Sequence, residues 1–171
     1  MIVRIRKSAY WQHTLPLGAL AMLLLLLVQF LLGMFVNLFI TIPSSHPGAS
    51  QDLASGAILG VAWAIAGAAP ALAVHTAIGF LLTAGAVGLL AVAITADRGR
   101  ALVVLTTLGL LGVLGAGLNG IGFLNYTVDK TTYLMSVGFS VSAAAYVAVL
   151  FFARQPVVTG LEEASGQTAG S

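Results

Sequence analysis

The chain has 171 residues, of which 59% are hydrophobic and 7% are charged, and its mean hydropathy is +1.04. These values lie far outside the range of soluble globular domains and predict an integral membrane protein. The lack of cysteine excludes disulfides, thiolate metal sites and a cysteine nucleophile, and the net charge of +2 lies in small basic groups at the ends of apolar runs, which indicates membrane topology and no nucleic-acid binding.

The first long apolar run, residues 15–40, has 26 residues without a charge. About 20 residues suffice to cross roughly 30 Å of hydrocarbon, so this run predicts the first span, with 1–14 as a cytoplasmic N-terminus. The basic residues Arg4, Arg6 and Lys7 resemble the start of a signal peptide. The apolar run is too long for one, and an uncleaved anchor is therefore favoured.

Residues 53–96 follow with 44 positions and no charge. As one helix they would measure about 66 Å, about twice a bilayer, so they must form two elements. Residues 71–95 predict the second span. The stretch 53–69 is rich in Ala and Gly, contains Trp63 and ends before Pro70. It predicts either a short helix on the outer surface or an extension of the second span.

The third and fourth spans are predicted at 101–125 and 132–153, and the tail, 154–171, is expected to be cytoplasmic and disordered. The distribution of basic residues tests this count, because cytoplasmic loops are rich in Lys and Arg. Four spans place both termini in the cytoplasm of a prokaryotic plasma membrane. Lys130 then lies outside, while all other basic residues share the inner side: Arg4, Arg6, Lys7, Arg98, Arg100 and Arg154.

Two pairs of segments indicate an internal repeat. LLGMFVN at 31–37 aligns with VLGAGLN at 113–119, and HTAIGFLLTAGA at 75–86 aligns with LMSVGFSVSAAA at 134–145. Both matches occur in the same order, which predicts two helical hairpins related by a pseudo-two-fold axis along the membrane normal. The expected fold is an all-α membrane protein, a four-transmembrane-helix bundle of two pseudo-repeated hairpins plus a short outer-surface helix.

Polar side chains occur inside the predicted spans at similar depth. Because such groups are costly in hydrocarbon unless paired, we expect them to face the interior and to form a polar site in the outer leaflet. Hydrogen bonding between helices would also explain the carboxamides without any ligand. The polar site is predicted at Gln29, Asn37, Asn119 and Ser136, beside His75.

Two histidines are candidate ligands. His75, inside the second span, could titrate, bind a metal or ligate haem iron, or serve as a hydrogen-bonded structural residue. His46 lies between Pro43 and Pro47 in the outer loop, where it either folds back over the site or occupies a solvated turn. The turn is favoured.

The motif Q-x-x-L-G-x-x-V at 29–36, followed by an outer loop with helical content and a span with a histidine, resembles the repeating four-helix half of the haem A synthases. The resemblance covers 15–153 and implies haem binding with His75 as one axial ligand. The equivalent position in the fourth span is Leu134, not histidine, and no acidic residue lies inside a span. The resemblance therefore does not extend to synthase activity.

Three functions remain open. The first is a scaffold or accessory subunit that packs against itself or a larger membrane complex. The second is a haem-binding electron carrier, with haem b as the possible cofactor and Met135 or His46 as the second ligand. The third is a protein that binds or transports a small ligand or lipid. Catalysis is not favoured, because all acidic residues lie at or beyond span ends and no nucleotide-binding motif is present.

Overall fold

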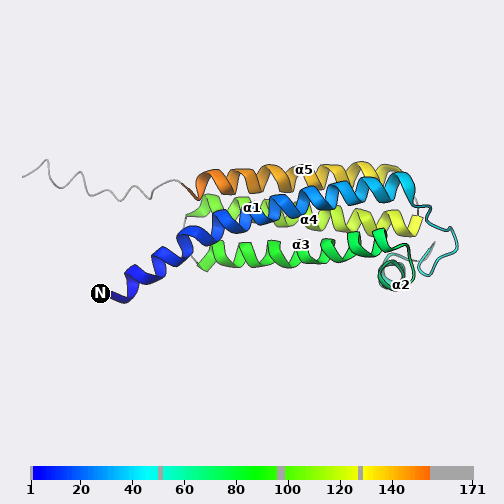
Figure 1. Ribbon diagram of the computed structural model, residues 1–171, viewed down its shortest axis with the longest axis horizontal. Coiled ribbons are helices and arrows are strands. Elements are labelled where there is room, and N and C mark those ends of the chain that lie inside the picture. Colours follow the sequence, from blue (N-terminus) through cyan, green and yellow to red (C-terminus); the bar gives the residue numbers. More distant parts are fainter. Residues whose placement is uncertain (1, 50–51, 96–98, 127–128, 155–171) are drawn as a thin grey trace, which may run out of the picture.

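The computed structural model describes residues 2–49, 52–95, 99–126 and 129–154, and within them it contains helices and no strand (Figure 1). This confirms the predicted all-α class. The helices are α1 (Ile2–Phe39), α2 (Leu53–Ala66), α3 (Pro70–Thr95), α4 (Arg100–Tyr126) and α5 (Asp129–Phe152).

Four of these helices are long and apolar enough to cross a membrane, which supports a multi-pass membrane protein. The membrane-length segments are His13–Phe39, Pro70–Thr95, Arg100–Tyr126 and Lys130–Phe152. The first helix is longer than its span, because α1 begins at Ile2 and passes through Pro16 without ending. Of the tail expected to be disordered, 155–171 lies outside the described residues.

The four long helices lie side by side (Figure 1), and each packs against two of the others, so that they form a ring. Both α1 and α4 pack against α3 and α5, whereas, in the described part of the chain, α1 does not contact α4 and α3 does not contact α5. This arrangement is compatible with two hairpins, α1 with α3 and α4 with α5, about a central pseudo-two-fold axis.

The short helix α2 lies crosswise at one end of the bundle, where Figure 1 views it nearly along its axis. It packs against α3 and α4, so it is a separate helix and not an extension of α3. Asp52 caps its start by accepting hydrogen bonds from the N–H groups of Ala54 and Ser55. At its other end the N–H groups of Gly67 and Ala68 both donate to the carbonyl of Trp63, before α3 begins at Pro70.

The two ends of the bundle are filled differently. At the α2 end, a smaller apolar cluster formed by Val36, Ala64, Leu72 and Leu124 joins α2 to the long helices. The opposite end is a continuous core of buried side chains. Between these two clusters the interior of the bundle is less completely filled. This core includes Leu15, Ala19, Met22, Leu89, Leu102, Tyr146 and Val149.

Candidate functional site

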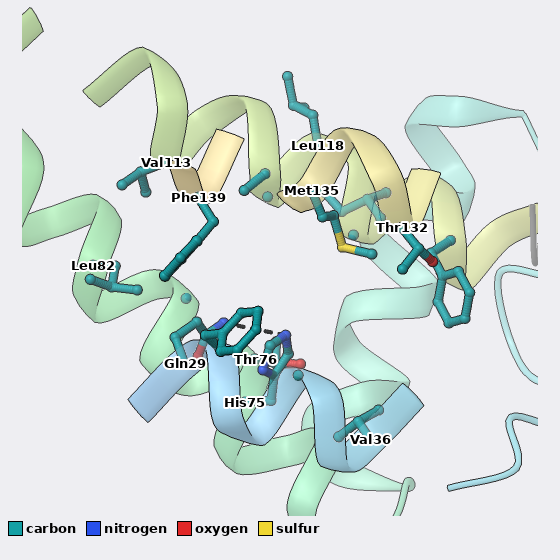
Figure 2. Close-up of a pocket in the computed structure, with 18 of the residues that line it drawn as sticks. Gln29, Val36, His75, Thr76, Leu82, Val113, Leu118, Thr132, Met135 and Phe139 are labelled. Carbon is teal, nitrogen blue, oxygen red and sulfur yellow. Dashed lines mark hydrogen bonds between the residues drawn. The ribbon is translucent and has the colours of Figure 1, made fainter. Parts of the chain in front are cut away.

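A cavity of about 410 Å³ lies between the two hairpins in the half of the bundle nearer α2 (Figure 2). All four long helices contribute to its walls, and Ile42 and Val61 line it from the loop after α1 and from α2. Most of its lining is apolar. The apolar residues include Leu26, Phe30, Val36, Leu72, Leu82, Val113, Ala116, Ile121, Leu124, Met135 and Phe139.

One polar pair joins two helices at the cavity wall. Gln29 Nε2 on α1 lies 3.3 Å from His75 Nε2 on α3, and the imidazole packs over Gly33, where a Cβ would come 2.9 Å from His75 Cε1. When the amide donates to Nε2, the imidazole carries its proton on Nδ1. Gln29 Oε1 and His75 Nδ1 are buried without a hydrogen-bond partner in the described part of the chain. Each such group costs about 1–3 kcal/mol while it lacks a partner, and both atoms are covered by their neighbours.

The facing wall carries a thioether. Figure 2 shows Met135 of α5 across the cavity from His75, and the Met135 sulfur lies over Gly120 of α4. The nearby hydroxyls are already engaged with backbone, since Thr76 donates to the carbonyl of Leu72. Ser136 likewise donates to Thr132, and Ser142 to Gly109 across the α4–α5 interface. The Gln29–His75 pair and the exposed carboxamide of Asn37 are therefore the main hydrogen-bonding groups of the described lining.

The cavity is closed at the end that faces the apolar core, and it is open to the surface of the bundle. Phe30 of α1 and Phe139 of α5 stack with their ring centroids 5.1 Å apart, and Figure 2 places Phe139 beside Leu82 and Val113 at the end away from α2. Eight of the described residues that line the cavity are also exposed, and they come from all four long helices: Phe30, Met34, Asn37, Phe80, Leu114, Gly117, Leu118 and Ser136. The cavity thus reaches the surface of the bundle, where lipid chains would lie.

The two hairpins pack differently around this space. In the α4–α5 hairpin a Cβ at Gly138 would lie 2.6 Å from the carbonyl oxygen of Gly112, so the two backbones are in direct contact. In the α1–α3 hairpin the side chains of Gln29 and His75 fill the interface beside Gly33. The polar pair therefore takes the place that close backbone contact occupies in the other hairpin.

The structure brings together five of the seven predicted site residues. Those lining the cavity are Gln29, Asn37, His75, Met135 and Ser136. Asn119 does not line it, because its amide donates to the carbonyl of Gly115 on the same helix at 2.8 Å. His46 also lies away from the lining, and it is 7% exposed, so the favoured interpretation of a solvated turn is wrong.

A residue that sequence reasoning missed is Asn125, near the end of α4. Its side chain is 2% exposed, and neither amide atom has a described hydrogen-bond partner. It packs against Gly56 and Gly60, because a Cβ on either glycine would lie within 3.3 Å of the amide. The available signal was the Gly-x-x-x-Gly spacing of α2, which favours close helix packing.

The lining contains no charged side chain in the described segments, and no cluster of three or more His, Cys, Asp or Glu residues able to hold a metal ion occurs there. Comparison with protein-family models, curated proteins and solved structures gave no match. Fold and site together therefore define a small four-helix membrane protein with a mostly apolar cavity and one buried polar pair.

Proposed function

We propose that the chain binds a small lipid-soluble molecule in the cavity between its hairpins. The observation that carries this proposal is the pairing of Gln29 and His75 on the wall of a mostly apolar space of about 410 Å³. Ligand sites in proteins have this size and this composition, with a few polar groups that fix the orientation of the ligand. Buried polar groups inside membrane spans are functional candidates because they are costly there.

The size of the cavity favours ligand binding over the scaffold hypothesis. Because the space opens to the surface of the bundle, it does not stay empty in a bilayer, and a lipid chain or another lipid-soluble molecule fills it. A bundle whose role was packing alone would close this space, as α4 and α5 do through Gly112 and Gly138. The exposed part of its lining gives a lipid-soluble molecule a route into it from the surface of the bundle.

Retention of a bound molecule by the purified protein tests the proposal. Gly79 lines the cavity, and its added Cβ would make ordinary contact, 3.5 Å, with Gln29 Nε2, so Gly79→Leu fills the space. Gly88→Leu is the matched control, because Gly88 is on the same helix, outside the lining, with nothing within 4 Å. We expect native mass spectrometry to find a non-detergent molecule on the parent protein and on Gly88→Leu, and not on Gly79→Leu. Equal occupancy in all three, or none in any, overturns the proposal.

Haem is the second candidate ligand, because His75 and Met135 face each other across the cavity (Figure 2). Histidine and methionine together form a known axial pair for haem iron, and bound haem would supply one-electron transfer. Nε2 of His75 would have to leave Gln29 to reach the iron. The described lining also offers no basic side chain for the haem propionates, and this places haem second.

Absorbance distinguishes the two candidates. The detergent-purified protein, from cells able to make haem, is measured as isolated and after dithionite reduction beside His75→Ala. A Soret band that shifts on reduction and disappears in His75→Ala supports haem. A spectrum without absorbance beyond that of the aromatic side chains excludes it and leaves a colourless lipid-soluble ligand.

A further inference from the structure

His46 makes an unusual set of contacts for a loop histidine. Its ring is buried, with Nδ1 2.8 Å from the carbonyl oxygen of Pro47 and Nε2 2.9 Å from the carbonyl oxygen of Leu124 on α4. The ring also stacks on Trp63 of α2, with centroids 4.3 Å apart and an angle of 14° between the planes. One imidazole thus joins the loop after α1, the helix α2 and the end of α4.

The two carbonyl contacts favour one protonation state of this ring. A carbonyl oxygen can only accept a hydrogen bond, so each ring nitrogen must donate. Neutral imidazole carries one N–H, and its other nitrogen would direct a lone pair at a carbonyl oxygen. Both bonds of His46 form together only in the imidazolium, which has two N–H donors.

The surroundings of His46 also favour a cation. The carbonyl of Leu124 is one of the last four of α4, which have no partner within the helix and carry its partial negative charge. The face of the Trp63 indole attracts cations at the observed separation. Neither Asp52 at the start of α2 nor Lys130 at the start of α5 makes a described contact with the ring. Asp52 is exposed and bonded to Ser55, and Lys130 is exposed.

The backbone around His46 is also tightly packed. Gly48 has a φ of +94° and lies against Gly60 of α2, where a Cβ would stand 2.5 Å from the Gly60 nitrogen. We call residues 40–49 together with α2 the cap. Ile42 and Val61 of the cap line the cavity, so the position of the cap affects access to it.

We propose that His46 is a proton-binding site whose protonated form fastens the cap to the end of α4. Without that proton only one ring nitrogen can donate, and when the remaining N–H stays on the Pro47 carbonyl within the cap, the bond to Leu124 is lost and the cap loosens from α4. The bound proton therefore favours the closed cap. The proton site stands independently of any ligand, whereas control of ligand exchange rests on the function proposed above.

Fluorescence of Trp63 reports the proton directly. The chain has two tryptophans, so Trp11→Phe leaves Trp63 as the single emitter. An imidazolium stacked on indole quenches its emission more than neutral imidazole does, and we expect emission to rise with pH in a single-proton step. His46→Gln should abolish this step, while His13→Gln, at the exposed far end of α1, should keep it. A missing step, or one that survives His46→Gln, overturns the proposal.

Cysteine labelling reports the cap without any ligand, because the native chain has no cysteine. Val61→Cys places a thiol on the face of the cap that lines the cavity, and Ile58→Cys places one on the exposed face of α2, at 73% exposure. The ratio of their maleimide labelling rates cancels the pH dependence of thiol chemistry. Loss of one charge-assisted hydrogen bond predicts that this ratio rises about tenfold as His46 deprotonates, and that it stays constant in His46→Gln.

If the ratio of the two labelling rates stays constant with pH while His46 is native, the proposal that the cap opens is wrong. If His46→Gln does not fold, ring ¹⁵N chemical shifts of the native protein decide the matter. Both nitrogens must be protonated in the closed cap, and one must lose its proton over the pH range in which Trp63 emission rises. Failure of the cavity to retain a ligand would leave all these results unchanged, so the two proposals fail separately.

Discussion

Gly138 of α5 lies directly against the backbone of Gly112 on α4, so closely that a Cβ at Gly138 would stand 2.6 Å from the Gly112 carbonyl oxygen and 2.8 Å from the Ala116 nitrogen. Both neighbours are backbone atoms, which cannot rotate away. Close approach of small residues is how helices associate in lipid, where no hydrophobic force drives them together. This contact fixes the closed hairpin that forms one side of the cavity.

Gly138→Ala should therefore separate α4 from α5 and destabilise the bundle by about 1–3 kcal/mol, the usual cost of overpacking. Alanine also favours helix over glycine, so the change must be judged against Gly115→Ala, where nothing lies within 4 Å of the added Cβ. Thermal unfolding in one detergent measures both. A melting temperature of Gly138→Ala equal to that of Gly115→Ala would contradict the close contact.

Gly33→Ala tests the Gln29–His75 pair, because the added methyl group would meet a side chain that can move. The added Cβ would lie 2.9 Å from His75 Cε1, a side-chain atom, so we expect the imidazole to shift and its bond to Gln29 to break. The melting temperature should fall below that of Gly88→Ala, because the broken bond leaves buried polar groups unpaired, and retention of the bound molecule should fall with it. Native mass spectrometry and thermal unfolding separate these effects. Loss of stability without loss of ligand would assign Gly33 to packing alone.

The sequence predicted the number of spans well because hydropathy and length are local properties, and Pro70 marks the break between α2 and α3. The sequence did not predict well which face of each span points into the bundle. The spans are apolar all round, so no stripe indicates which side meets the other helices, and Asn119 therefore looked equivalent to Gln29. His46 looked exposed because its burial depends on Gly48 meeting Gly60, a contact that local composition does not reveal.

Asn125→Leu tests whether the buried Asn125 amide, which packs against α2, destabilises the fold. Neither amide atom has a described partner, and leucine has a similar shape, so the substitution should remove an unsatisfied polar pair and raise stability by about 1–3 kcal/mol. Asn119→Leu is the comparison, because that amide already donates to Gly115. Thermal unfolding gives the sign. A loss of stability in Asn125→Leu would mean that water or another polar group satisfies this amide.

Asp52 makes the start of α2 sensitive to acid. The Ser55 hydroxyl, followed by backbone N–H groups, donates to its carboxylate and holds the pKa of Asp52 below its usual value of 3.8. Because the folded pKa is lowered, this stabilisation is present above the unfolded pKa and is lost as the pH falls through the folded pKa. Amide exchange in α2, relative to α5, should accelerate on such acidification. Asp52→Asn, which caps without titrating, should show no acceleration.

Gln29→Leu and Asn119→Leu form a matched pair, since each removes one carboxamide from inside a span. Gln29 lines the cavity and bonds to His75, whereas Asn119 bonds to its own helix. If the polar pair orients the ligand, Gln29→Leu should weaken retention about tenfold, as expected for the loss of a buried hydrogen bond, and Asn119→Leu should leave it unchanged. Titration of the identified molecule, or its occupancy by native mass spectrometry, measures this. Equal losses in the two variants would indicate that both carboxamides serve the packing of the bundle.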